Sequence, residues 1–154
     1  MVDVDPDDGD GVWEVASGVD ALYLSGHREA PAWLIAKLNL LRTRAAEESM
    51  PQPYEFGGYR FMVHPRGWGP YTYLLTHPFG RIGVTASSQF PAFRVQPLTI
   101  ALHGLGAAAT FEWFRDVIST EVDDVRFTVS RLDLYCDVQG WVPTAESRHE
   151  VVCR

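Results

Sequence analysis

The sequence predicts an α+β fold, an antiparallel β-sheet (a meander of short strands) with two main helices packed on one face. Three observations lead to this prediction. A helical pattern follows the first β-like segment, a series of short β-rich runs fills the middle of the chain, and a second helical pattern precedes a long alternating segment. The middle runs have short connections, which implies antiparallel pairing. Helices that lie outside such a run of strands are expected over one face of the sheet.

The first expected strand covers residues 19–26 and closes at Gly26. Pro31 then opens a helix that runs to about Glu48, because proline is well tolerated in the first helical turn. The apolar residues that recur at helical spacing in this segment are Trp33, Leu34, Leu38 and Leu41.

Pro51 and Pro53 end the helix, and short β-rich runs follow between Gly and Pro breaks. The expected strands are Phe56 to His64, Tyr71 to His77, Arg81 to Thr85, Phe93 to Gln96 and Leu98 to His103. A helix is expected from Ala107 to Thr120, with an apolar stripe that includes Phe111 and Phe114. A long strand from Val125 to Gln139 follows it.

The length of 154 residues and the hydrophobic content of 46% predict one domain with a real core, over residues 18–154. Residues 1–17 are expected to be an acidic disordered tail, since five of the acidic residues lie in the first ten positions. The sequence contains no leader-like segment and no apolar run of about 18 residues. The chain also has only two cysteines, which is typical of proteins in a reducing compartment. Together, these features predict a cytoplasmic protein without a membrane partner.

The formal net charge of −7 argues against a nonspecific polyanion binder, because Lys and Arg supply most of the affinity for phosphates. The objection is partial, since the acidic tail carries much of this charge. Among the basic residues only Lys37 is a lysine. The arginine bias suits bidentate contacts to phosphate or carboxylate, although a GC-rich genome would produce the same bias.

The most informative segment is residues 130–140, where apolar and polar residues alternate. The apolar row, which we expect to pack inward, is Leu132, Leu134, Cys136 and Val138. The opposite row is Arg131, Asp133, Tyr135 and Asp137. Carboxylates on one strand face could converge on a hard divalent cation, and a guanidinium beside them could hold a phosphate. The alternative is a solvent-exposed strand face with a surface ion pair.

Four segments together resemble the replication initiation factor family, the Rep proteins of rolling-circle plasmids and filamentous phages, with the actinobacterial members most similar. The resemblance extends from about Gly18 to the end of the chain. Its segments are residues 18–26, Gly67-Trp68-Gly69, Phe79-Gly80-Arg81-Ile82-Gly83-Val84 and Ser130-Arg131-Leu132-Asp133-Leu134-Tyr135-Cys136-Asp137. The Arg-x-Asp-x-x-x-Asp strand is the most specific of them.

The resemblance implies rolling-circle replication initiation, in which a divalent metal, Mg²⁺ or Mn²⁺, orients the scissile phosphate and a tyrosine attacks it. Asp133 and Asp137 would then be the catalytic metal ligands, and Arg131 would contact the phosphate or one of the carboxylates. The implied partner is origin DNA, single-stranded or as a hairpin. A helicase and a second copy of the chain, in a homodimer, are further partners that this reading leaves open.

The chain departs from this family in its length, which is about half of that expected. The nucleophilic tyrosine is therefore expected beyond Arg154, and Tyr135 is a poor substitute because it lies inside a rigid strand. We expect the chain to be the N-terminal half of a Rep protein, inactive in nicking alone and with an unknown nucleophile. The alternative from a different class is a non-catalytic DNA- or protein-binding module.

Other residues were weighed for DNA or metal binding. Trp68 and Tyr71, with Arg66 nearby, could form a stacking surface for unpaired bases. The alternative is a Gly/Pro turn whose tryptophan covers the sheet edge. His103 at a strand end could be a metal ligand or a histidine bonded to backbone. The segment Gly104-Leu105-Gly106 lacks the remaining residues of a phosphate loop, so we interpret it as a tight turn before a helix.

Overall fold

The computed structural model describes residues 13–140. Their elements, in chain order, are β1 (Trp13–His27), α1 (Ala32–Glu48), β2 (Gln52–Phe56), β3 (Tyr59–Val63), β4 (Tyr73–His77), β5 (Gly80–Val84), β6 (Phe93–Pro97), α2 (Thr99–Leu105), α3 (Ala107–Glu121) and β7 (Arg126–Gln139). None of the helices within these residues is long and apolar enough to cross a membrane.

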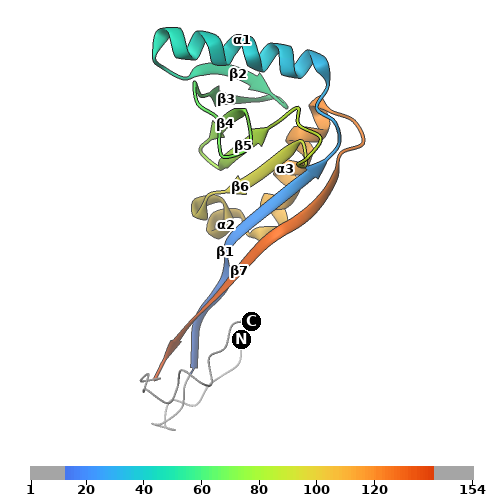
Figure 1. Ribbon diagram of the computed structural model, residues 1–154. Coiled ribbons are helices and arrows are strands. Elements are labelled where there is room, and N and C mark those ends of the chain that lie inside the picture. Colours follow the sequence, from blue (N-terminus) through green and yellow to red (C-terminus); the bar gives the residue numbers. More distant parts are fainter. Residues whose placement is uncertain (1–12, 141–154) are drawn as a thin grey trace. The chain divides into compact units, whose positions relative to one another are not determined.

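The strands of the described residues form a seven-stranded sheet in the order β2-β3-β4-β5-β6-β1-β7. Strands β2 to β6 follow one another as an antiparallel meander, and β1 pairs antiparallel with β6. The first strand thus returns to the sheet beside the last strand of the meander (Figure 1). The predicted α+β class with an antiparallel sheet is confirmed.

The core lies on one face of this sheet. Ile82 in β5 is opposite Leu75 in β4 and Val95 in β6, and Val95 is opposite Leu24 in β1. All four side chains are fully buried, because residues in register on neighbouring strands point to the same face. Burial of this apolar row supplies the main driving force for the sheet to fold against its helices.

Helices α1 and α3 cover the same face. Leu34 and Leu38 of α1, and Phe114 and Ile118 of α3, belong to one apolar cluster with the buried residues of the sheet. In Figure 1, α3 lies behind β6 and α1 crosses beyond β2. The predicted packing of two main helices on one face is therefore confirmed, and the opposite face, which we call the open face, carries neither of them.

Two segments differ from the sequence prediction. Leu98 to His103 was expected as a strand and instead lies mostly in α2, where the adjacent residues Ala101 and Leu102 are both buried. An extended strand would place these two side chains on opposite faces. The hydroxyl of Thr110 in α3 donates a hydrogen bond of 3.0 Å to the Ala101 carbonyl oxygen, which ties the two helices together.

The second difference is the run from Phe56 to His64, which contains the turn between β2 and β3 instead of one strand. The first strand also begins earlier than expected, at Trp13. Residues 13–17, which were expected to belong to the disordered tail, therefore lie in β1 instead. Residues 1–12 of the expected tail lie outside the described residues.

The chain divides into two units, and β1 and β7 each contribute to both. Val19–Leu134 forms the unit that contains the helices and the core. The described part of the other unit consists of residues 13–18 and 135–140. Within that part, Gly18 lies so close to Tyr135 that a Cβ atom there would be 2.9 Å from the ring carbon Cε1.

The turn between β2 and β3 packs on α3 through Gly57. This residue has a φ of 59°, and an added Cβ would lie 2.3 Å from the carbonyl oxygen of Val117. Its N–H donates a hydrogen bond of 2.7 Å to the carboxylate of Glu121. Gly58 also has a positive φ, of 80°, but an added Cβ would meet nothing within 4 Å. A side chain at either glycine would strain the backbone, but only a side chain at Gly57 would also clash with α3.

We expect Gly57→Ala to lower the free energy of unfolding by clearly more than Gly58→Ala. The second change costs about 1–2 kcal/mol for a left-handed alanine, while the first adds a clash with the α3 backbone. Urea unfolding followed by circular dichroism measures both. Equal losses would contradict the close approach of Gly57 to α3.

Candidate nucleic-acid interface

The open face carries the side chains that alternate with the core residues. In β5 and β6 these positions are Arg81, Gly83, Arg94 and Gln96, because Ile82, Val84, Phe93 and Val95 point into the core. In β1, Tyr23 alternates with the buried Leu22 and Leu24 and therefore lies on the open face too.

Gly83, which has no side chain, leaves room for two aromatic rings on this face. An added Cβ at Gly83 would lie 2.8 Å from Tyr71 Cγ and 3.2 Å from Trp68 Cε3. The backbones of Trp68 and Tyr71 are joined by two hydrogen bonds of 2.8 and 3.1 Å, which close a tight turn in the connection between β3 and β4. Their ring centroids are 6.3 Å apart. Tyr71 is only 4% exposed, and its burial raises the pKa of its hydroxyl, an effect that Arg94 opposes.

Trp68 receives two arginine side chains. The guanidinium carbon of Arg81 lies 4.1 Å from the Trp68 ring centroid, and that of Arg94 lies 4.8 Å from it. Contacts of a guanidinium with an indole at these distances are cation–π interactions, which are strongest with tryptophan. The tryptophan on Gly83 thus fixes two cationic groups from neighbouring strands in one place.

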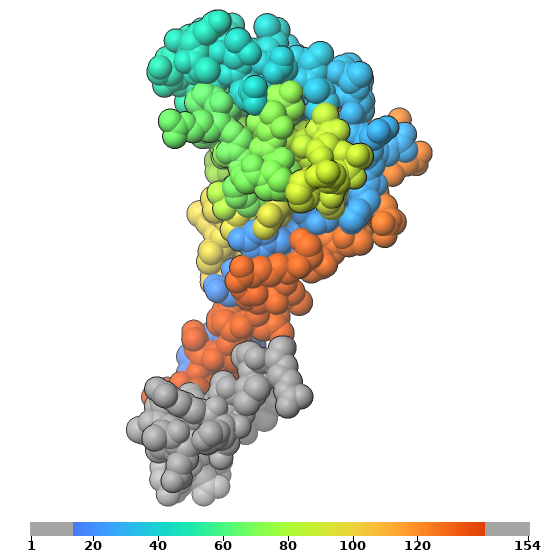
Figure 2. Space-filling model, in the orientation of Figure 1, coloured from blue at the N-terminus to red at the C-terminus, as the bar shows by residue number. Residues whose placement is uncertain are grey.

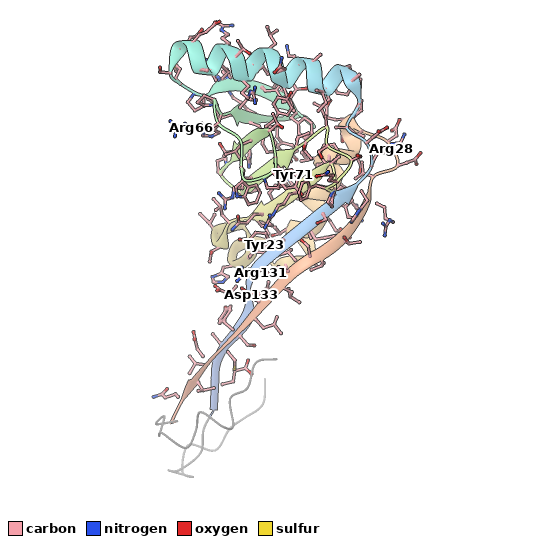
Figure 3. All side chains as sticks on the ribbon, viewed as in Figure 1. Tyr23, Arg28, Arg66, Tyr71, Arg131 and Asp133 are labelled. Atoms are coloured by element: carbon pink, nitrogen blue, oxygen red, sulfur yellow. The ribbon has the colours of Figure 1, made fainter. Side chains whose placement is uncertain are left out.

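Tyr23 continues the same arrangement toward the sheet edge. Its ring lies 5.2 Å from the guanidinium carbon of Arg94 and 5.5 Å from that of Arg131 in β7. In Figure 3, Tyr71, Tyr23 and Arg131 follow one another over the open face toward β7, which carries Arg131. Arginines and aromatic rings therefore alternate across four elements, a set that we call the arginine–aromatic row: Arg81, Trp68, Arg94, Tyr23 and Arg131.

The charges of the row are only partly neutralised. Arg81 donates hydrogen bonds to the side-chain oxygen of Gln96, which is an uncharged acceptor. Within residues 13–140, no carboxylate lies within ion-pair distance of Arg81 or Arg94. Two guanidinium groups on one sheet face therefore keep their full positive charge, a suitable site for an anion.

Arg131 differs, because it forms an ion pair with Asp133 two residues away. Its Nε donates hydrogen bonds of 3.0 Å to both carboxylate oxygens, and Nη2 donates to Oδ2. This pairing holds the pKa of Asp133 below its usual value and raises that of Arg131. Both side chains are exposed to solvent, so the pair contributes little to stability.

His64 and Thr76 occupy the open face on β4 and its neighbouring segment. The Nε2 atom of His64 and the hydroxyl of Thr76 are 2.8 Å apart. Burial lowers the pKa of His64, which favours the neutral ring. This histidine thus contributes a hydrogen-bonding group without charge.

Strand β7 corrects one prediction. Leu132, Leu134, Cys136 and Val138 were expected to pack inward, but all are exposed, Leu132 by 52% and Leu134 by 73%. Near the start of β7, Phe127 packs on the core and Thr128 bonds His27. At the start of β7, therefore, the odd-numbered Phe127 faces the core and the even-numbered Thr128 faces the open face.

Farther along the strand, the odd-numbered Arg131 also contacts an open-face residue of β1, Tyr23. The alternation of faces is therefore shifted by one residue between Thr128 and Arg131. Arg131 and Asp133 consequently lie on the open face, as one row of the predicted alternation. Leu132 and Leu134 alternate with them and are not covered, because β7 is the edge strand of the sheet.

A metal centre at the predicted carboxylates does not fit this geometry. Both oxygens of Asp133 accept hydrogen bonds from Arg131. Residues four positions apart in a strand are separated by about 13 Å, too far for Asp133 and Asp137 to share one ion. The described residues contain no group of three or more His, Cys, Asp or Glu side chains able to hold a metal.

The predicted DNA-binding residues have different surroundings. Trp68, Tyr71 and Arg131 lie on the open face as described above, but the tryptophan covers the middle of the sheet and not its edge. Arg66 is exposed at the side of the sheet, away from the labelled Tyr71 (Figure 3). Trp68 instead contacts Arg81 and Arg94, which the sequence analysis did not select.

The signal for these missed residues was present in the sequence. Arg81 and Arg94 alternate with apolar residues in their short strands, which places them on the polar face. Tyr23 alternates with leucines in the same way. Only the pairing of β5, β6 and β1 brings the three side chains together.

No family model, curated protein or solved structure matches the chain. The resemblance to the replication initiation factor family therefore stays a prediction.

We expect Gly83→Val to displace Trp68 from the sheet, because a β-branched side chain suits the strand but occupies the space of the two rings. Acrylamide quenching of tryptophan fluorescence should increase, while the far-ultraviolet circular dichroism stays unchanged. A Trp68→Phe chain identifies the contribution of this tryptophan to the signal. Unchanged quenching in Gly83→Val would contradict the close packing on Gly83.

Proposed function

We propose that Val19–Leu134 binds single-stranded nucleic acid along the arginine–aromatic row of the open face. The observation that carries this proposal is the pair of unneutralised guanidinium groups of Arg81 and Arg94, both held over Trp68. Guanidinium groups bind phosphate oxygens through two parallel hydrogen bonds, and their fixed orientation lowers the entropic cost of binding.

An unpaired strand suits the site better than a duplex does. The row runs across a sheet face, and no helix lies on that face among the described elements to enter a major groove. Proteins that bind single strands combine cationic groups along the backbone with aromatic side chains that contact bases. The rings of Trp68 and Tyr23 between the arginines supply the aromatic component.

The net negative charge of the chain is compatible with this proposal. Phosphate binding depends on the local potential, which falls off within about 8 Å at physiological salt. Five acidic residues lie in the first ten positions, outside the described residues, and the row contains three arginines with one carboxylate next to them. Affinity should therefore be moderate and strongly dependent on salt.

Replication initiation is a more specific form of the same proposal, with origin DNA as the ligand. The segment that suggested it contributes Arg131 to the row, which supports contact with DNA. Its metal-dependent step has no support in the geometry of Asp133. A nicking assay on supercoiled origin DNA with Mn²⁺ tests it, and the absence of nicking alongside retained strand binding would leave the non-catalytic binding module.

We expect Arg94→Gln to lower affinity for an oligodeoxythymidine roughly tenfold at low salt, because one phosphate contact is lost. The slope of log K against log salt should fall by about 0.7 for each lost contact with a single strand. Fluorescence anisotropy with a labelled oligonucleotide measures both.

The matched control is Arg115→Gln on α3. Arg115 is also exposed, but it pairs with Glu112 and Asp116 on the helix that covers the other face. Its substitution should leave affinity and salt slope unchanged. Equal effects of the two substitutions would indicate nonspecific attraction and would contradict a site on the open face.

Asp133→Asn distinguishes phosphate binding from metal binding by the direction of the change. Removal of the carboxylate frees the Arg131 guanidinium and makes the net charge of the row more positive by one, so binding of the oligonucleotide should become several-fold tighter. The effect should be the same in EDTA and in Mg²⁺. Weaker binding that appears only with Mg²⁺ would instead favour a metal at Asp133.

A further inference from the structure

A cavity lies beside Tyr71 and is lined in part by its neighbour Phe90. It has a volume of about 410 Å³ and is formed by the end of β1, the segment before α1 and the connection between β5 and β6. Figure 2 shows the yellow-green residues of this connection next to the blue residues that follow β1. Its lining includes His27, Arg28, Glu29, Gln89 and Phe90.

Phe90 connects this cavity with the arginine–aromatic row. Its ring centroid is 6.5 Å from that of Tyr71, which is in turn 6.3 Å from Trp68. Phe90 is 44% exposed, so part of its ring is available to a ligand. Aromatic side chains thus continue without a break from the two cationic groups to the cavity.

The connection between β5 and β6 is held by its own hydroxyl groups. The Thr85 hydroxyl accepts a hydrogen bond of 3.2 Å from the N–H of Ser87, and the Ser87 hydroxyl accepts one of 3.3 Å from the N–H of Gln89. Thr85 is buried at the start of this connection. These bonds fix the backbone that carries Gln89 and Phe90, so the cavity wall is preorganised.

The charges of the lining do not favour a phosphate. Arg28 forms an ion pair of 3.5 Å with Asp124, and Glu29 also lines the cavity. The imidazole of His27 is bonded to the Thr128 hydroxyl at 2.9 Å. What remains is a partly exposed ring, an amide and hydroxyl groups, which suit a flat uncharged ligand with hydrogen-bonding edges.

We infer that this cavity binds one unpaired nucleobase of a strand whose backbone lies on the arginine–aromatic row. Phe90 would stack on the base, and Gln89 would donate to or accept from its edge, as amide side chains can do with any base. This inference rests on the proposed function and adds a base site next to the phosphate site.

The test combines Phe90→Ala with oligonucleotides that carry one abasic position, scanned along the strand. For the unsubstituted protein, one abasic position should weaken binding fivefold or more, about the contribution of one stacked base. Phe90→Ala should weaken binding of the intact oligonucleotide to the same extent and should abolish the additional effect of the abasic position. Fluorescence anisotropy gives all four affinities.

Leu105→Ala is the matched control, because Leu105 is an apolar residue of nearly the same exposure on α2. It should leave all affinities unchanged. Phe90→Leu, which keeps the apolar bulk, should lose the abasic effect if stacking is the cause. Circular dichroism establishes that the variants remain folded.

Two results would overturn the inference, unchanged binding by Phe90→Ala and independent, additive effects of the two changes. In either case, dependence of binding on Arg94 would leave the proposed function intact. If Arg94→Gln also has no effect, the proposed function itself fails. The two failures are therefore distinguishable.

Discussion

The close packing of Trp68 and Tyr71 on Gly83 is the contact on which the open face depends. A side chain at Gly83 would occupy the space of both rings. With the rings in place, Trp68 lies within cation–π distance of Arg81 and Arg94, and the two guanidinium groups are held near each other in spite of their like charge. The cost of bringing two cations together is offset by the ring and by the solvent that still reaches them. A bound anion would relieve the remaining repulsion.

One-sided packing explains why such a face exists. Both main helices lie on the same side of the sheet, so the alternate residues of every central strand must tolerate water. Here the demand is met by arginines and aromatic rings together, a combination with more apolar surface than solubility needs and with charge left unpaired among the described residues. The net charge of the chain does not reveal this local arrangement, because most of the excess acid lies elsewhere.

The alternating segment of β7 shows how a pattern can be right and its interpretation wrong. Arg131 and Asp133 share a face, as the alternation predicts, but Leu132 and Leu134, which alternate with them, are exposed. Alternation fixes which side chains are on the same side of a strand and does not fix whether anything covers them. Arg131 and Asp133 satisfy each other, which is the surface ion pair weighed as the alternative, and the guanidinium also contacts Tyr23.

Helices α1 and α3, the antiparallel meander and the one-sided core could be predicted from the sequence alone, because periodicity and Gly/Pro breaks are local signals. The sequence also marked Trp68 and Tyr71 as a candidate surface. Residues 99–105 form a helix because of long-range packing, since the burial of Ala101 and Leu102 and the bond from Thr110 of α3 outweigh their β-like pattern. The partners of Trp68 also depend on the tertiary structure. Arg81 and Arg94 are 13 residues apart in the sequence. Only the pairing of β5 with β6, in which Arg94 is opposite Gly83, places both beside Trp68 from the connection between β3 and β4. Strand order and register are long-range properties, which a local pattern cannot specify.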